Sequence, residues 1–186
     1  MRLVLALGLM AHAGPAQAAA VLQNGKAVAT IVVDATGSQG EGESILNDAA
    51  QWLVASLERA SGAKFVQATE VPDGTALIIA RADAWPQVAK AARLKPGAFG
   101  AYAIVPRGNR MFVLGNTEAG ARHGVAALLR EWGFRWLAPA PRWWITPKLD
   151  SLKISESQTS APALIDRRIW YAYGMGEADL KPLQAN

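Results

Sequence analysis

The sequence contains no cysteine and only two histidines among its 186 residues. Without cysteine, the chain can form no disulfide framework, thiolate metal site, iron–sulfur cluster or cysteine nucleophile. Two histidines are too few for a multi-histidine metal centre. We therefore expect neither a metal nor a cofactor, and a length of 186 residues is enough for a domain that folds around its own core.

The chain also lacks a strong net charge. The net charge is +4, and the basic residues form no run or stripe of the kind that binds nucleic acid. An apolar run at residues 3–11 is far shorter than the ~20 residues that a helix needs to span a bilayer. We expect no nucleic-acid partner and no membrane span.

The first 18 residues have the layout of a secretory signal peptide. Arg2 provides a short positive region, the apolar run at 3–11 follows, and small residues precede a cleavage site after Ala18. The alternative is a buried N-terminal helix, which Gly14-Pro15 would break. The sequence therefore predicts export, and a secreted or periplasmic location.

Hydrophobic periodicity predicts an α/β domain over residues 19–155, with helices packed on one mixed sheet. Helices are expected at about 43–61, 83–94 and 118–132, because apolar residues recur there at helical spacing. Strands are expected at 27–34, 65–68, 75–80, 101–106, 110–114, 135–137 and 152–154, with the fourth and fifth forming a hairpin. Residues 156–162 are small and polar and predict a linker, after which residues 163–186 begin a new unit.

A glycine-rich loop precedes the first helix and invites comparison with phosphate-binding loops. The spacing of Gly37, Gly40 and Gly42 matches neither of the usual nucleotide-binding motifs. Glu41 and Glu43 stand where a phosphate would bind and would repel it. We interpret the loop as a turn with an acidic helix start, which argues against a nucleotide-binding enzyme.

No pair of carboxylates is marked by its spacing as a general acid and base. Asp34, Asp73, Asp83 and Glu118 fall in turns or at helix starts, where carboxylates commonly cap helices or face solvent. His123 lies beside the apolar stripe of its helix and is interpreted as a packed or surface histidine. We therefore name no catalytic residue.

The most unusual feature is a cluster of tryptophans at positions 132, 136, 143 and 144, interleaved with arginines. Trp132 occupies a core position of its helix. Trp143 and Trp144 are neighbours in an extended segment, so one side chain should point inward and the other outward. These tryptophans fit packing against a following domain, or stacking on sugar rings with arginine binding hydroxyls or carboxylates.

Several segments of the chain resemble the non-catalytic N-terminal domain found before glycoside hydrolase barrels. The resemblance covers about residues 25–170, with its more specific elements in the second half. The matching segments are the helix DAAQWLVASLERASGAKF at 48–65, VLGN at 113–116, GARHGV at 120–125, WGFRWLAP at 132–139 and ITPK at 145–148, where Ile-Thr-Pro replaces the commoner Val-Ile-Pro. It is similar to the hexosaminidase-like second domain of family 67 α-glucuronidases, and to related secreted bacterial proteins whose barrel is a domain of unknown function.

The resemblance implies an accessory α/β domain followed by the start of a truncated (β/α)₈ barrel, with the chemistry in the barrel. Partners would be that barrel and, through it, an oligo- or polysaccharide, while the chain as given would have no hydrolase activity. If residues 165–170 form an inner barrel strand, Arg168 and Tyr171 are candidates for substrate contact, and Trp144 is a third. The alternative is a stand-alone carbohydrate-binding module that uses Trp143 or Trp144.

Overall fold

A computed structural model describes residues 19–95, 100–137 and 141–160 of the chain. Its centre is a six-stranded mixed sheet in the order β11-β6-β7-β5-β3-β4. The strands are β3 (Thr30–Asp34), β4 (Gln67–Ala68), β5 (Ala76–Arg81), β6 (Tyr102–Arg107), β7 (Arg110–Gly115) and β11 (Gln158–Thr159). Strands β4, β3, β5 and β7 run parallel, whereas β6 and β11 are antiparallel to their neighbours.

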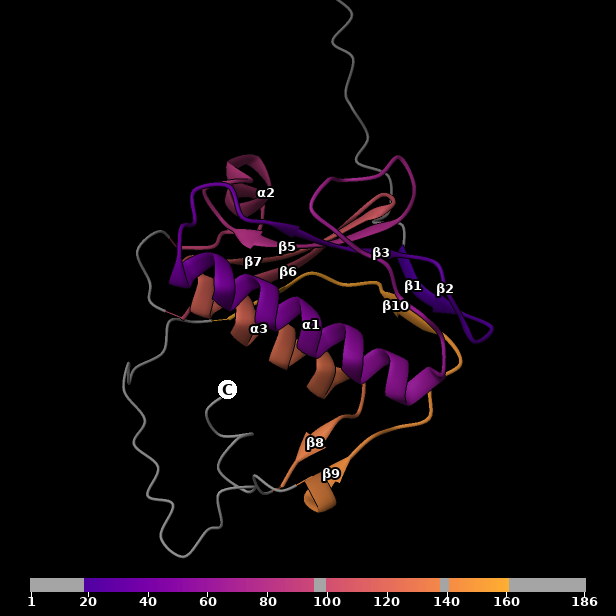
Figure 1. Cartoon of the computed structure of the whole chain (residues 1–186). Helices are drawn as coiled ribbons and strands as arrows, with labels where there is room; N and C mark the ends of the chain where they lie inside the picture. The colour runs from indigo at the N-terminus through magenta and orange to yellow at the C-terminus, as the bar shows by residue number, and fades with distance from the viewer. Residues whose placement is uncertain (1–18, 96–99, 138–140, 161–186) are drawn as a thin grey trace, which may run out of the picture.

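Helices cover both faces of this sheet, as Figure 1 shows. The long helices α1 (Glu41–Ser61) and α3 (Glu118–Glu131) lie side by side on one face, and the short helix α2 (Pro86–Ala91) lies on the other. Successive residues of β3 alternate between the two cores: Ile31 and Val33 join α1 and α3, and Val32 joins α2. The period of two that a strand imposes therefore builds two apolar layers from one run of β-branched residues.

Two smaller strand groups flank the main sheet. Strand β1 (Ala19–Gln23) pairs with β10 (Leu152–Ile154) and with β2 (Lys26–Ala27), which brings the two ends of the described domain together. A separate hairpin joins β8 (Arg135–Trp136) to β9 (Trp144–Ile145), and a 3₁₀ turn at Pro141–Trp143 precedes β9. Figure 1 shows this hairpin at the end of the molecule away from α2, below α1 and α3.

Local chemistry explains the ends of the two long helices. Gly62 closes α1 in the left-handed conformation (φ 75°), and its amide donates to the carbonyl of Glu58. Thr117 caps α3, because its hydroxyl accepts a hydrogen bond from the amide of Gly120 (3.1 Å). Helix α3 also lies very close to the sheet, since a Cβ on Gly124 would come within 2.6 Å of a methyl carbon of Val113.

The mixed α/β class, both long helices and the β6–β7 hairpin are confirmed. Helix α2 is shorter than predicted, because Pro86 sets its start and Arg93 leaves the helical conformation with φ 56°. Strand β3 starts at Thr30 rather than at residue 27, because the amides of Val28 and Ala29 both donate to the carbonyl of Val21. Strand β1 was not predicted.

The predicted linker at 156–162 needs a correction. Gln158 and Thr159 form β11, which pairs with Ile104 and Ala103 at the edge of the main sheet. The amide of Ser160 then donates to the carbonyl of Tyr102 (2.9 Å). A polar composition alone does not exclude a strand, because backbone groups of β6 supply these bonds. The predicted barrel segment at 163–186 lies outside the described residues.

Candidate functional site

The β8–β9 hairpin presents two chemically different faces. Trp136 lies opposite Trp144, and Arg135 lies opposite Ile145, in the antiparallel register. The Trp136–Trp144 pair faces α1, where Trp136 packs on Trp52, and Ile145 is half exposed while also bordering the space between the hairpin and α1. We call the exposed residues Arg135, Leu137, Trp143 and Ile145 the outer face of the hairpin.

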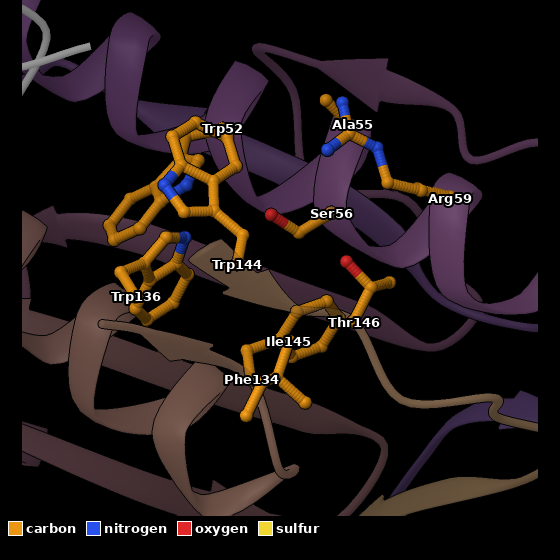
Figure 2. Close-up of a pocket in the computed structure, with 9 residues that line it drawn as sticks. All are labelled: Trp52, Ala55, Ser56, Arg59, Phe134, Trp136, Trp144, Ile145 and Thr146. Carbon is orange, nitrogen blue, oxygen red and sulfur yellow. The ribbon is translucent and has the colours of Figure 1, made fainter. Parts of the chain in front are cut away.

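The side of the hairpin toward α1 borders a cleft of about 170 Å³, which we call the α1–hairpin cleft (Figure 2). Helix α1 provides one wall, and the segment from Phe134 to Thr146 provides the other. The lining residues are Trp52, Ala55, Ser56, Arg59, Phe134, Trp136, Trp144, Ile145 and Thr146. The cleft is therefore built from two parts of the chain that are about eighty residues apart in sequence.

Aromatic rings hold the apolar end of this cleft in place. The rings of Trp136 and Phe134 are stacked with their centroids 6.3 Å apart, and Trp52 of α1 packs on Trp136 at 5.0 Å with a 51° tilt. Phe134 is buried, and the three indole side chains are half-buried, with Trp144 beside Trp52 and Trp136 in Figure 2. Such contacts fix ring positions before any ligand arrives.

Polar groups stand at the rim of the same cleft. Ser56 and Arg59 follow Trp52 along α1 by about one and two turns, which places all three on one side of the helix. Thr146 lies on the opposite wall. Within the part of the chain that the structure describes, the side chains of Ser56, Arg59 and Thr146 make no hydrogen bond or ion pair, so they are available to a ligand.

A second group of polar side chains gathers at the carboxyl ends of the parallel strands. In this Arg81 cluster, made of Ser38, Arg81, Asp83 and Glu118, the guanidinium of Arg81 donates to Asp83 (3.0 Å) and to Glu118 (3.2 Å). The hydroxyl of Ser38 also donates to Glu118 (2.7 Å). Sequence reasoning missed this cluster, because its members come from three separate segments of the chain: the loop after β3, the end of β5 and the start of α3. Their position at adjacent strand ends was the available signal.

The electrostatics of the Arg81 cluster are those of a closed ion-pair network. Burial raises the pKa of the Glu118 carboxyl, but hydrogen bonds from its own backbone amide, Ser38 and Arg81 outweigh it and lower the pKa overall. Hydrogen bonding to Asp83 raises the pKa of Arg81. Glu118 is thus held ionised, which suits a structural ion pair and not a proton donor.

The glycine-rich loop is positioned by this network and not by an anion. Glu41 and Glu43 are exposed in the first turn of α1, as expected, and Gly40 precedes them with φ 54°. A Cβ on Gly42 would lie 2.8 Å from the Glu118 carboxylate, so glycine leaves room for that side chain. The loop packs against a carboxylate, which supports our interpretation that it binds no phosphate.

The remaining predicted residues fall in different places. Trp144 lines the α1–hairpin cleft, Trp143 is 51% exposed on the outer face, and Trp132 is buried in the core. The expectation that one of Trp143 and Trp144 points inward is therefore confirmed. His123 is exposed on α3 with its Nδ1 atom 3.2 Å from the carbonyl of Gly100. Arg168 and Tyr171 lie outside the described residues.

Residues 19–95, 100–137 and 141–160 contain no group of three His, Asp or Glu side chains that could hold a metal ion. None of the helices described is long and apolar enough to cross a membrane.

Comparisons with known proteins identify the fold and not the family. No protein-family model matches the chain, and no curated protein matches it in sequence. Among solved structures, it is similar to a family GH115 4-O-methyl-α-glucuronidase, BtGH115A, with specificity for decorated arabinogalactans. The two are 16% identical with a TM-score of 0.53, and the match covers 75% of this chain but only 18% of that enzyme.

A weaker similarity is to a GH138 enzyme targeting pectin rhamnogalacturonan II, with 16% identity and a TM-score of 0.37 over 55% of this chain and 10% of that one. A similarity at that level carries no structural argument. The match to the GH115 enzyme shows that the chain shares the fold of one part of a much longer glycoside hydrolase.

Proposed function

We propose that this chain is the non-catalytic N-terminal α/β domain of an exported carbohydrate-active enzyme, a glycoside hydrolase, and that it packs on and stabilises a downstream (β/α)₈ barrel. The observation that carries the proposal is the outer face of the hairpin. Leu137, Trp143 and Ile145 are 67%, 51% and 50% exposed there, and Leu137 donates its amide to the carbonyl of Trp143. A contiguous apolar surface of this kind commonly marks an interaction site.

The polar chemistry of the described residues supports a non-catalytic role. Asp83 and Glu118 both form ion pairs with Arg81, and although burial raises the pKa of Glu118, hydrogen bonds lower it overall. The α1–hairpin cleft has no carboxylate in its lining. Hydrolysis of a glycosidic bond needs a pair of carboxyl groups in one cleft, one of them protonated. On our proposal these groups belong to the barrel, where Arg168 and Tyr171 would contact substrate.

Export is part of the proposal. The proposal keeps the signal peptide at residues 1–18 and a secreted or periplasmic product. Ala19–Gln23 form β1, which pairs with β10, so cleavage after Ala18 would keep this strand in the mature chain. The polysaccharide would be one handled by the barrel, as BtGH115A handles decorated arabinogalactans.

The outer face can be tested on the 186-residue chain itself. We expect the double variant Leu137→Ser/Trp143→Ser to bind much less of a hydrophobic fluorescent dye and to self-associate less, because the apolar surface is removed. Dye fluorescence and light scattering measure both effects. Val66→Ser is the matched control, since Val66 is 65% exposed beside edge strand β4. Equal losses in the control and the double variant would contradict an interaction surface on the hairpin.

A further inference from the structure

The α1–hairpin cleft offers a second site next to the packing surface. We propose that it binds one ring of an anionic saccharide, with the indoles stacking on the sugar and Arg59 binding its acidic group. Ile145 belongs to both the cleft and the outer face, whereas Leu137 and Trp143 do not line the cleft. Binding in the cleft is therefore tested on the 186-residue chain, in which nothing else has to cover the outer face.

The aromatic end of the cleft suits the apolar face of a sugar ring. Indole rings bury a large apolar area and keep a polar N–H for hydrogen bonding. Trp136 is fixed between Phe134 and Trp52, so its ring is already ordered. The volume of 170 Å³ is smaller than the roughly 300 Å³ at which pockets for larger ligands begin, which fits a single ring at an open surface.

The polar rim suits hydroxyls and one anionic group. The hydroxyls of Ser56 and Thr146 can each donate and accept, and they stand on opposite walls of the cleft. Arg59 lies on the same wall as Ser56, and its guanidinium is exposed. A planar guanidinium binds carboxylate or sulfate through two parallel hydrogen bonds, which is why we choose an anionic ligand.

Charges in the neighbouring chain strengthen this choice. Residues 132–149, which include the hairpin, contain Arg135, Arg142 and Lys148 and no aspartate or glutamate. On α1, Glu58 is next to Arg59, but its carboxylate already accepts hydrogen bonds from Lys64 (3.0 Å) and from the amide of Phe65 (3.2 Å). The hairpin segment thus carries only basic residues, which favours an anion over a neutral sugar, while exposed Asp48 lies one turn before Trp52 on α1.

The indole N–H signals of the whole chain provide a direct test by NMR. The chain has seven tryptophans, and the variants Trp52→Phe, Trp136→Phe and Trp144→Phe assign the three signals of the cleft. The probes are methyl glucuronoside, glucose 6-sulfate, neutral methyl glucoside and inorganic sulfate. We expect the two anionic sugars to move the three cleft signals and leave Trp85, whose indole donates to Asp34, unchanged.

A charge variant then tests the role of Arg59. We expect Arg59→Gln to weaken binding of the anionic sugars about tenfold, to the level of methyl glucoside, because a charge-assisted pair is lost. Arg107→Gln is the matched control, since Arg107 is also exposed and does not line the cleft. Both substitutions are at the surface, so both variants should fold.

Each outcome of this experiment decides the proposal. A response to the glucuronoside identifies a carboxylate ligand, and a response to the sulfated sugar alone identifies a sulfated one. Equal binding of methyl glucoside, or an unchanged response in Arg59→Gln, would overturn the anionic site. Shifts that inorganic sulfate reproduces in full, or no shift of the three indoles at millimolar sugar, would overturn the saccharide site.

Discussion

The two polar regions of this domain differ in what their arginines do. Arg81 is surrounded by two carboxylates and a loop carbonyl, and it ties together the ends of β3, β5 and the start of α3. Arg59 projects beside an aromatic cleft and has no ion-pair partner among the described residues. The contrast teaches that clustered charges in this fold hold loops together, whereas a charge left without a partner beside aromatic rings points to a ligand.

Matched substitutions of the two arginines should give the largest difference in stability. We expect Arg81→Met to lower the free energy of unfolding by about 2 kcal/mol, because Glu118 and Asp83 lose charge-assisted hydrogen bonds in a site where the Arg81 side chain is only 28% exposed. Arg59→Met should change it by no more than about 0.5 kcal/mol, as surface substitutions do. Urea denaturation measures both. Similar losses in the two variants would contradict the distinction between them.

Acid should weaken the Arg81 cluster by a smaller amount. The folded-state pKa of Glu118 lies below its ordinary value of 4.5, so its ionised form stabilises the fold above that pH. This stabilisation is lost as pH falls through the folded-state pKa. We expect the free energy of unfolding to decline between about pH 5 and pH 3, and to decline less in Glu118→Gln.

The comparison of wild type and Glu118→Gln isolates this group, because the carboxyl of Glu118 is the only one that differs between the two proteins. Adding Arg81→Met should shrink the difference between them, because Arg81 is one of the groups that lowers the Glu118 pKa. Parallel pH curves for the wild type and Glu118→Gln would show that Glu118 does not contribute through its charge.

Long periodic segments of this chain could be predicted from sequence, whereas assembled sites could not. The β-branched run ending at Asp34, the helix closed by Gly62 and the helix capped by Thr117 each carry local signals, and all three are confirmed. The short strands β1 and β11 carry none, because partners elsewhere in the chain supply their hydrogen bonds. A strand whose hydrogen bonds depend on a distant partner cannot be predicted from its local sequence pattern.

The same reasoning applies to the candidate site. The alternation at Trp143 and Trp144 predicted that one ring points inward, and the exposed Trp143 confirms it. Sequence did not predict that Trp52 and Arg59 would lie across from Trp144, because α1 and the hairpin are far apart in sequence and meet only in the folded chain. The paired state of Glu118 was hidden for the same reason.

The most direct test of the account is whether the outer face is covered in the natural protein. The coding DNA beyond codon 186 should be read, and the longer product compared with the 186-residue chain by hydroxyl-radical footprinting of Leu137 and Trp143. We expect labelling of both residues to fall several-fold in the longer product, while Val66 beside edge strand β4 stays equally labelled. A stop at codon 187, or equal labelling of Leu137 and Trp143 in the two products, would contradict a domain that packs on a downstream barrel.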